Sequence, residues 1–371
     1  MNSAEAAGLY VHIPFCRSKC PYCDFYSTTS LELLPLWLEA VVKEIDGYRG
    51  RFALFDSLYL GGGTPSLVDA ARLGALIDHL RRAFSFSDGM EITLEANPDD
   101  ITPGRLREAL DLGVNRISLG VQSLDEGELR LLKRRHTALQ AEEALAIIRS
   151  AGFENVGIDL IYGLPGQTVS GWLKTLDRAL GFGPEHVSCY QMTYEEGTLF
   201  GKRLKKGTMR PLGEDVERAF FLRTSRFLEK RGYLHYEISN FARAPEFVSR
   251  HNRKYWRRVP CLGLGPSAHS FDNDSRWWNV RSVSDYARRL MSGQSPVAGR
   301  EILTTEQVQL ERLSLGLRTS DGVPLETFAS CADSSGVLTR LSDSGLITVR
   351  GGAVVPTRKG FLVADGLALL F

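Results

Sequence analysis

Short apolar runs recur along the first 240 residues, and amphipathic patterns separate them. Runs of this kind, bounded by turn residues, predict buried β-strands. We expect strands at 8–13, 57–61, 91–96, 116–122, 156–163, 186–192 and 233–239, and helices at about 31–48, 68–83, 104–112, 125–132, 139–151, 168–181 and 214–231. The segments between the strands are long enough for right-handed βαβ crossovers, so the pattern predicts an α/β protein with parallel strands.

The positions of chemically capable residues distinguish two α/β folds. Cys16–Cys23 follows the first predicted strand, Gly61–Thr64 follows the second, and Glu95 ends the third. Gln122 and Asp159 lie late in the fourth and fifth strands. A (β/α) barrel collects functional residues at the carboxyl ends of many strands, whereas a doubly wound sheet binds its ligand at one switch point. The pattern favours a partial (β/α) barrel of the TIM type, and the doubly wound sheet is the alternative.

The pattern changes after about residue 240, and we expect three parts. Residues 1–240 form the partial barrel, residues 241–300 form a connector rich in Arg and Trp, and residues 301–371 form a small C-terminal domain. The last part predicts helices near 304–317, 323–330 and 335–344 and a hairpin around Gly351-Gly352. Helices followed by a hairpin indicate a helical, winged-helix-like domain, which we interpret as an interaction or lid module.

Composition narrows the class of protein. The 371 residues are 43% hydrophobic and 24% charged, and 45 basic residues stand against 44 acidic ones, a formal net charge of +1. Such a balance argues against a general nucleic-acid binder. The chain has no apolar run of about 18 residues, and its start lacks the basic and apolar regions of a signal peptide. We therefore expect a cytoplasmic protein.

Three of the six cysteines, Cys16, Cys20 and Cys23, stand within eight residues. Clustered cysteines in a reducing compartment indicate metal or redox chemistry. Structural zinc needs four ligands, usually as two pairs, and no second pair follows. A [4Fe–4S] cluster takes one cysteine per iron, so three cysteines would leave one iron open. The other cysteines are expected to be buried small side chains: Cys189, Cys261 and Cys331.

The spacing Cys16-x₃-Cys20-x₂-Cys23, with Tyr22 before the last cysteine, resembles the radical S-adenosylmethionine (SAM) superfamily. The resemblance implies that the amino and carboxylate groups of SAM bind the open iron. It also implies that the reduced cluster can cleave SAM to methionine and a 5′-deoxyadenosyl radical. The sequence leaves open whether SAM is cleaved here.

Further segments predict the SAM site. The run "LGGGTPS" (60–66) lets backbone groups approach a ligand, and a plain tight turn is the alternative. The resemblance assigns Gly62, Gly63 and Thr64 to the SAM amino group. An acid inside an apolar strand, as at Asp159, is costly unless it has a partner, and ribose hydroxyls would supply one.

The remaining SAM contacts come from the resemblance or from charge. Glu95 could pair with an ammonium group. The positions that match SAM-contacting positions of the family are Tyr10, Tyr22, Gln122 and Arg134, with Arg134 at the SAM carboxylate. For the two tyrosines ordinary packing is the alternative, and for Arg134 it is a solvated basic face.

Much of the chain resembles the branch that contains oxygen-independent coproporphyrinogen III oxidase. The segments that carry this likeness are "HIPFC" (12–16), "GGGTPS" (61–66), "LEANPDD" (94–100), "NRISLGVQS" (115–123), "GIDLIYGLPGQT" (157–168) and "YEISNFA" (236–242). Two departures point toward the heme-chaperone branch of the same family. The oxidase has a further cysteine where this chain has Phe25, and it has a long N-terminal extension, whereas nine residues precede Tyr10.

The segment "HNRKYW" (251–256) matches the His-Asn-x-x-Tyr-Trp motif of the heme-binding branch. The resemblance assigns His251, Asn252, Tyr255 and Trp256 to heme. The imidazole of His251 could bind the iron, and the two aromatic rings offer flat faces to a porphyrin. His269 and His235 are alternative axial ligands, and a basic loop that docks its Trp on the barrel is the ordinary explanation. The cations expected at the propionates are Arg250, Arg253, Lys254, Arg257 and Arg258.

The resemblance implies a heme chaperone that carries a [4Fe–4S] cluster and SAM. It would transfer heme to acceptor hemoproteins, with respiratory enzymes at the inner face of the membrane as candidates, and a homodimer stays open. Nucleic acid is not an expected partner. One alternative is an enzyme that decarboxylates coproporphyrinogen III. Another is a radical enzyme that acts on a different tetrapyrrole or small molecule.

Overall fold

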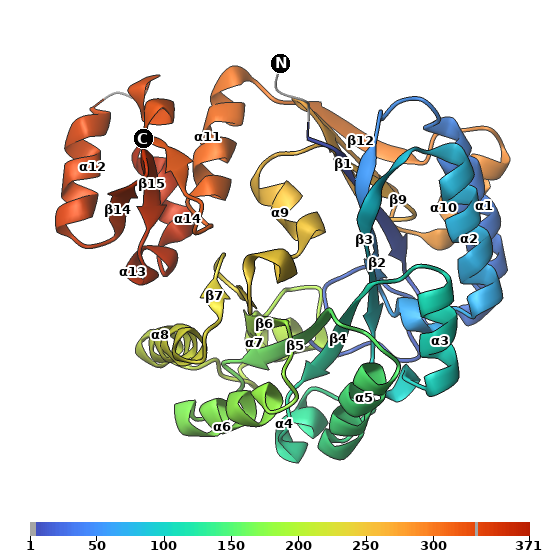
Figure 1. Cartoon of the computed structure of the whole chain (residues 1–371), viewed down its shortest axis with the longest axis horizontal. Coiled ribbons are helices and arrows are strands. Elements are labelled where there is room, and N and C mark those ends of the chain that lie inside the picture. The colour runs from blue at the N-terminus through green and yellow to red at the C-terminus, as the bar shows by residue number, and fades with distance from the viewer. Residues whose placement is uncertain (1–4, 331–332) are drawn as a thin grey trace.

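The computed structural model describes residues 5–330 and 333–371, and its largest feature is an open barrel of strands with helices outside (Figure 1). Twelve strands form one sheet in the order β12-β11-β10-β9-β1-β2-β3-β4-β5-β6-β8-β7. Neighbouring strands from β1 to β6 pair in parallel. These six strands are Ala7–Ile13, Phe55–Gly62, Phe86–Ala96, Arg116–Gln122, Val156–Tyr162 and His186–Gln191. The prediction of an α/β partial barrel is confirmed.

Eight helices follow the strands of the barrel. Seven of them lie close to their predicted positions, and the short helix at 199–205 was not predicted. They are α1 (Leu34–Gly47), α2 (Ala70–Ala83), α3 (Pro103–Asp111), α4 (Glu126–Leu131), α5 (Ala138–Ser150), α6 (Val169–Leu180), α7 (Leu199–Lys205) and α8 (Glu214–Lys230). Side-chain caps fix several starts, as at α5, where Thr137 and Gln140 form a capping box. The helices therefore begin where local chemistry satisfies their free amide groups.

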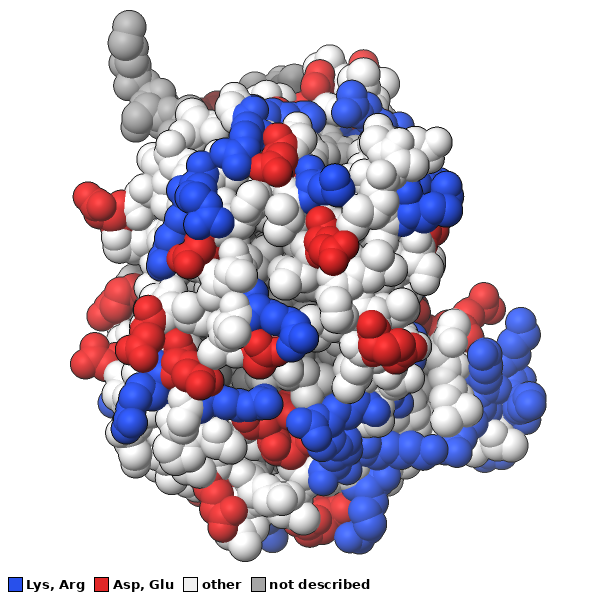
Figure 2. All heavy atoms as spheres, turned by 90° about the vertical axis from the view of Figure 1, so that its right-hand side faces the viewer, with Lys and Arg blue, Asp and Glu red and all other residues white. Residues whose placement is uncertain are grey.

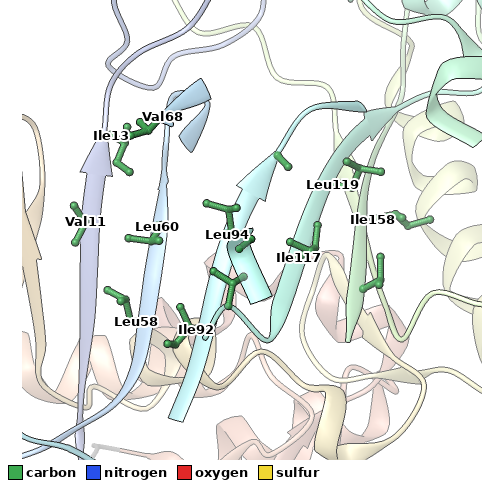
Figure 3. Close-up of a cluster of buried hydrophobic side chains, with 14 of the residues drawn as sticks. Val11, Ile13, Leu58, Leu60, Val68, Ile92, Leu94, Ile117, Leu119 and Ile158 are labelled. Carbon is green, nitrogen blue, oxygen red and sulfur yellow. The ribbon is translucent and has the colours of Figure 1, made fainter. Parts of the chain in front are cut away.

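The strands of the barrel carry apolar side chains on their outer face. Figure 3 shows Val11 and Ile13 of β1 beside Leu58 and Leu60 of β2. The alternate positions of β1, Tyr10 and His12, lie on the opposite, inner face. Burial of the aliphatic side chains against the helices stabilises the barrel by roughly 1.5–3 kcal/mol per side chain. Successive side chains on a strand point to opposite faces of the sheet, so the polar side chains between these aliphatic positions face the inside of the barrel.

The sheet continues beyond the parallel strands at both ends. At one end β9 (Cys261–Leu264) pairs in parallel with β1, and β10 (His269–Asp272), β11 (Ser275–Asn279) and β12 (Val297–Ile302) follow in antiparallel order. Residues 241–300 thus add strands to the barrel sheet, together with the helices α9 (Arg250–Trp256) and α10 (Val283–Met291). Cys189 and Cys261 are buried as predicted, and Cys331 lies outside the described residues.

At the other end, the prediction of a strand over 233–239 is wrong. Only β7 (Leu234–His235) forms there, and it pairs antiparallel with β8 (Asn240–Ala242). The chain reverses at Glu237, whose carboxylate accepts a hydrogen bond from the Ser239 amide at 3.2 Å. A buried polar turn therefore replaces the predicted strand.

The C-terminal domain packs helices on a small antiparallel sheet, beside α9 and α8 (Figure 1). Its elements are α11 (Thr305–Gly316), β13 (Val323–Pro324), a 3₁₀ helix (Leu325–Ser330), α12 (Ser334–Asp343), β14 (Ile347–Arg350), β15 (Ala353–Pro356), α13 (Arg358–Phe361) and α14 (Ala364–Leu367). The predicted hairpin is confirmed, because Gly351 and Gly352 adopt φ values of 58° and 78° between β14 and β15. Within 323–330 a short strand and a 3₁₀ helix replace the predicted α-helix.

Charges of both signs are mixed over the surface, as Figure 2 shows for one face, where a denser group of basic side chains lies toward the lower right. Across residues 5–330 and 333–371, no helix is long and apolar enough to span a membrane.

A buried carboxylate connects α1 to the strands after β9. Glu44 accepts hydrogen bonds from the Gly265 amide at 2.7 Å, Asn279 Nδ2 at 2.6 Å and Tyr286 Oη at 2.5 Å. Burial raises the pKa of Glu44 to about 7, even though these three donors favour its charged form. The strength of the contacts that Glu44 makes between α1 and α10 therefore depends on pH.

The substitution Glu44→Gln is expected to flatten the pH dependence of stability. The folded pKa of about 7 lies above the ordinary value, so stability from Glu44 is fully present at low pH and lost as pH rises through 7. Between about pH 5 and pH 8, the free energy of unfolding should fall by about 2 kcal/mol less in the variant. Urea unfolding of both proteins at the two pH values measures this difference. Equal falls would contradict the assignment.

Candidate functional site

The three clustered cysteines lie on the loop between β1 and α1, beyond the carboxyl end of the barrel strands. The Cys16 amide donates to Thr28 O at 2.9 Å, and the Cys23 amide donates to Cys20 O at 3.3 Å. Burial raises the pKa of the Cys16 thiol and raises that of Cys23 to about 11. These thiols must lose their protons to bind a metal, so metal binding and proton release are linked.

Two side chains from other loops donate to the cysteine sulfurs. Thr64 Oγ1 lies 3.5 Å from Cys16 Sγ, and Arg134 Nη1 lies 3.4 Å from Cys20 Sγ. Hydrogen bonds to sulfur are one of the means by which proteins tune iron–sulfur clusters. In the part of the chain that the structure describes, no three His, Cys, Asp or Glu side chains form a site for a single metal ion. Three separate thiols with donors to sulfur fit a cubane, where each thiolate binds its own iron.

Asn97 links the glycine-rich loop to Arg134. Asn97 Nδ2 donates to Thr64 Oγ1 at 3.1 Å, and its Oδ1 accepts from Arg134. Arg134 also donates to Gly120 O at 2.9 Å. Arg134 therefore points toward the cluster loop and not onto a solvated face. Asn97 follows the third strand, among the chemically capable residues expected at the carboxyl ends of the strands, but its bonds to Thr64 and Arg134 could not be predicted from the sequence.

Glu95 is a half-buried acid on the inner face of β3. Its carboxylate accepts from Tyr59 Oη at 2.8 Å and from the Gly62 amide at 3.0 Å. Burial raises the pKa of Glu95 to about 7, and the negative charge of Asp159 acts in the same direction. A positively charged ammonium group of a ligand would lower this raised pKa, because a nearby opposite charge favours the ionised carboxylate. Glu95 thus fits the predicted contact with an amino group.

The other predicted SAM residues lie around the same end of the barrel. Asp159 accepts from Ser118 Oγ at 3.1 Å, and burial raises the pKa of Asp159. Gln122 adopts a left-handed φ of 67°, a conformation that is strained for a residue with a side chain. Gly63 lies against the β1 chain, because an added Cβ would come within 2.7 Å of Ile13 O.

The two predicted tyrosines have protein partners. Tyr10 Oη lies 2.9 Å from His12 Nδ1 on the inner face of β1, and the Tyr22 ring lies 6.3 Å from that of Phe200. Phe25, two positions after Cys23, is 69% exposed.

The "HNRKYW" segment forms α9, which lies at the opposite, amino-terminal end of the strands (Figure 1). Glu91, at the start of the inner face of β3, accepts from the backbone amides of Arg250 and His251 at 3.0 and 3.1 Å. Lys254 Nζ reaches Asp56 at 2.7 Å and Ala6 O at 2.6 Å. These contacts hold α9 across the starts of β1, β2 and β3.

α9 directs two aromatic side chains into the barrel. His251 Nδ1 lies 3.1 Å from Ser57 Oγ, and its Nε2 lies 3.0 Å from Tyr255 Oη. The His251 ring lies 5.2 Å from the Tyr59 ring and 6.3 Å from the Tyr10 ring. Burial lowers the pKa of His251 to about 3, assisted by the charges of Lys254 and Arg116. The imidazole is therefore neutral at physiological pH.

The cations that were predicted to meet heme propionates have protein partners. Arg253 and Arg257 both contact Asp321 of the C-terminal domain, at 2.7 and 2.9 Å. Arg258 pairs with Glu311, and Arg250 donates to backbone carbonyls. Trp256 lies beneath the Arg318 guanidinium, 5.6 Å from its ring centre. Arg253 and Trp256 of α9, with Arg257 and Arg258 just after the helix, attach this segment to the C-terminal domain, whereas Arg250 attaches it to the barrel. The Asn252 amide donates to Ser249 Oγ in the first turn of the helix.

The alternative histidines lie in other surroundings. His269 stacks on Trp278 with ring centres 6.0 Å apart. His235 stacks on Phe241 at 4.2 Å and hydrogen-bonds Ser225 at 3.0 Å. Of the three histidines, His251 has the contacts with the inner face of β1 and β2.

Comparison with known proteins identifies the family. The model of the radical SAM superfamily matches residues 10–179, and the model of the HemN C-terminal domain matches residues 303–363. A heme chaperone HemW of Mycobacterium tuberculosis is 34% identical over 366 residues, covering 97% of this chain and 93% of the relative. This chain belongs to the HemW family. A HemW of Synechocystis sp. is 36% identical over 324 residues, 85% of this chain and 78% of the relative.

A solved structure supports the fold of this HemW-family chain. Coproporphyrinogen III oxidase (HemN) of Escherichia coli, described as a radical SAM enzyme, superimposes with a TM-score of 0.85 and 25% identity. The match covers 99% of this chain and 90% of the oxidase. The barrel and the C-terminal domain are therefore shared between the two branches of the family.

Substitution of one clustered cysteine should abolish cluster binding. Anaerobic reconstitution of the wild-type chain is expected to give about four irons and four sulfides per chain, because three thiolates and one open iron form a cubane. Cys20→Ser should lose most of this iron, whereas Cys189→Ala, at a buried cysteine far from the loop in sequence, should keep it. Iron and sulfide analysis and the visible spectrum measure the outcome. A single zinc per wild-type chain would refute the cluster.

Asp321→Asn should loosen α9. The substitution removes the shared partner of Arg253 and Arg257, and exposed ion pairs contribute about 0.2–1 kcal/mol each. Amide hydrogen exchange over residues 250–256 is therefore expected to become about threefold faster. Asp285→Asn, which removes arginine contacts within α10, is the control and should leave this exchange unchanged. Unchanged exchange in Asp321→Asn would contradict the attachment.

Proposed function

We propose that this protein is a heme chaperone, which binds heme and transfers it to acceptor hemoproteins. One observation carries the proposal: α9 places His251 and Tyr255 on the inner face of the barrel, against Tyr10 and Tyr59. Membership of the HemW family supports it, because curated relatives over nearly the whole length are heme chaperones. The residues proposed to form the heme site, by contact or by support, are His251, Asn252, Tyr255 and Trp256.

The opposite end of the barrel is proposed to hold a [4Fe–4S] cluster and SAM. Cys16, Cys20 and Cys23 would hold three irons, and the bound cluster supplies one-electron chemistry at the SAM sulfonium. Residues of this chain orient the small molecule: Tyr10, Tyr22, Gly62, Gly63, Thr64, Glu95, Gln122, Arg134 and Asp159. The raised pKa of Glu95 and the donors to the cysteine sulfurs support this set.

The division into three parts completes the proposal. The barrel (1–240) carries cluster and SAM, the connector (241–300) carries the heme-contacting helix, and the C-terminal domain (301–371) holds that helix through Asp321. We further propose that the acceptors are respiratory enzymes at the inner face of the membrane, reached by a cytoplasmic protein that can form a homodimer.

The alternative function is oxidative decarboxylation of coproporphyrinogen III. The shared fold with the Escherichia coli oxidase favours it. Phe25 disfavours it, because its exposed ring stands where the oxidase branch has a further cysteine. The chaperone function fits both the family and the motif on α9.

Hemin titration tests the heme-binding function. The wild-type chain is expected to give a saturable Soret shift with one hemin per chain. His251→Ala should weaken binding by about tenfold, because the imidazole supports the heme-contacting side chains. His269→Ala, at a histidine that stacks on Trp278 instead, is the matched control and should bind as the wild type does. A wild-type chain without a saturable shift would overturn the proposal.

A second assay separates chaperone from enzyme. Cluster-loaded protein with SAM, a reductant and coproporphyrinogen III should yield no protoporphyrinogen, while hemin binding persists. Formation of protoporphyrinogen at a steady rate would favour the oxidase.

A further inference from the structure

His251 is the residue of α9 that sequence chemistry would choose as the heme ligand, but both of its ring nitrogens are engaged. Nδ1 contacts Ser57 Oγ at 3.1 Å, and Nε2 contacts Tyr255 Oη at 3.0 Å. The residue is 1% exposed, and an added Cβ on Gly8 would lie 3.2 Å from its Cε1. An iron would have to break one of these bonds and enter a packed position. The His251 imidazole is therefore better placed to hold a neighbouring side chain in position than to bind the iron.

Tyr255, the hydrogen-bonded neighbour of His251, is more exposed to solvent than His251. Tyr255 is 42% exposed, whereas its hydroxyl still contacts His251 Nε2. A tyrosine oxygen has two lone pairs, so it can accept one hydrogen bond and bind a metal at the same time. Tyrosinate is a known axial ligand of heme iron. Of these two residues, Tyr255 is the one that presents an exposed side chain to a planar iron complex.

We propose that Tyr255 supplies the axial oxygen ligand of ferric heme and that His251 is the positioning residue that hydrogen-bonds this oxygen. This inference rests on the proposed heme-chaperone function. In the step, the O–H bond of Tyr255 breaks and an Fe–O bond forms. A hydroxide ligand leaves the ferric iron and takes the proton as water. The iron stays ferric, so no electron donor or acceptor is needed.

The surroundings of the pair suit this exchange. If Ser57 donates its hydroxyl hydrogen to Nδ1, the neutral imidazole presents Nε2–H to the Tyr255 oxygen.

The spectrum of the hemin complex tests the assignment, with purified full-length protein and ferric hemin as the probe. The wild type should show a high-spin ferric signal in electron paramagnetic resonance and tyrosinate vibrations in resonance Raman spectra. Tyr255→Phe should lose the tyrosinate vibrations and bind hemin more than about tenfold more weakly. His251→Ala should keep those vibrations at shifted frequencies, because it removes only the hydrogen bond to the ligand.

Tyr190→Phe is the matched control, since Tyr190 of β6 is also 42% exposed. It should keep the wild-type spectrum and affinity. Circular dichroism of each variant checks folding. Saturable hemin binding with an imidazole-type spectrum in the wild type, or tyrosinate vibrations that persist in Tyr255→Phe, overturns the ligand assignment and leaves the chaperone function standing. Absence of saturable hemin binding in the wild type overturns both.

Discussion

The alternation of side chains along β1 to β6 is the constraint on which the rest of the structure depends. Outward positions carry aliphatic side chains that pack beneath the helices, and inward positions carry Tyr10, Tyr59, Glu95 and Asp159. Many (β/α) barrels fill this interior with branched apolar residues. Buried polar groups require partners, and each of these four side chains hydrogen-bonds a neighbour, so that they form a polar inner surface.

Two groups of functional residues use opposite ends of that surface. The cysteine loop and the glycine-rich loop lie at the carboxyl ends of the strands, and α9 lies at the amino ends. Tyr59 connects them, because its hydroxyl donates to Glu95 while its ring lies 5.2 Å from that of His251. A change at Glu95 on one side therefore has a short physical route to the heme-contacting side chains on the other.

The cysteine loop could be predicted, because its three candidate metal-binding residues lie close together in sequence and their spacing is enough to identify them. The three cysteines share one loop, and the βα loops that approach them follow from parallel strand order. The position of α9 could not be predicted, since it depends on Glu91 and Ser57, which precede it by about 160 and 194 residues. The cations of α9 were expected to be free for propionates, yet Asp321 and Glu311 of the distant C-terminal domain neutralise several of them. The strand over 233–239 failed for a local reason: the buried carboxylate of Glu237 accepts from the Ser239 amide and stabilises a turn there.

The location of α9 at the floor of the barrel has a consequence for how the two proposed ligands would influence each other. In the proposed function the sulfonium cofactor lies toward the carboxyl ends of the strands and the porphyrin toward the amino ends, on opposite sides of Tyr59. Binding of one ligand would then alter the surroundings of the other through Tyr59.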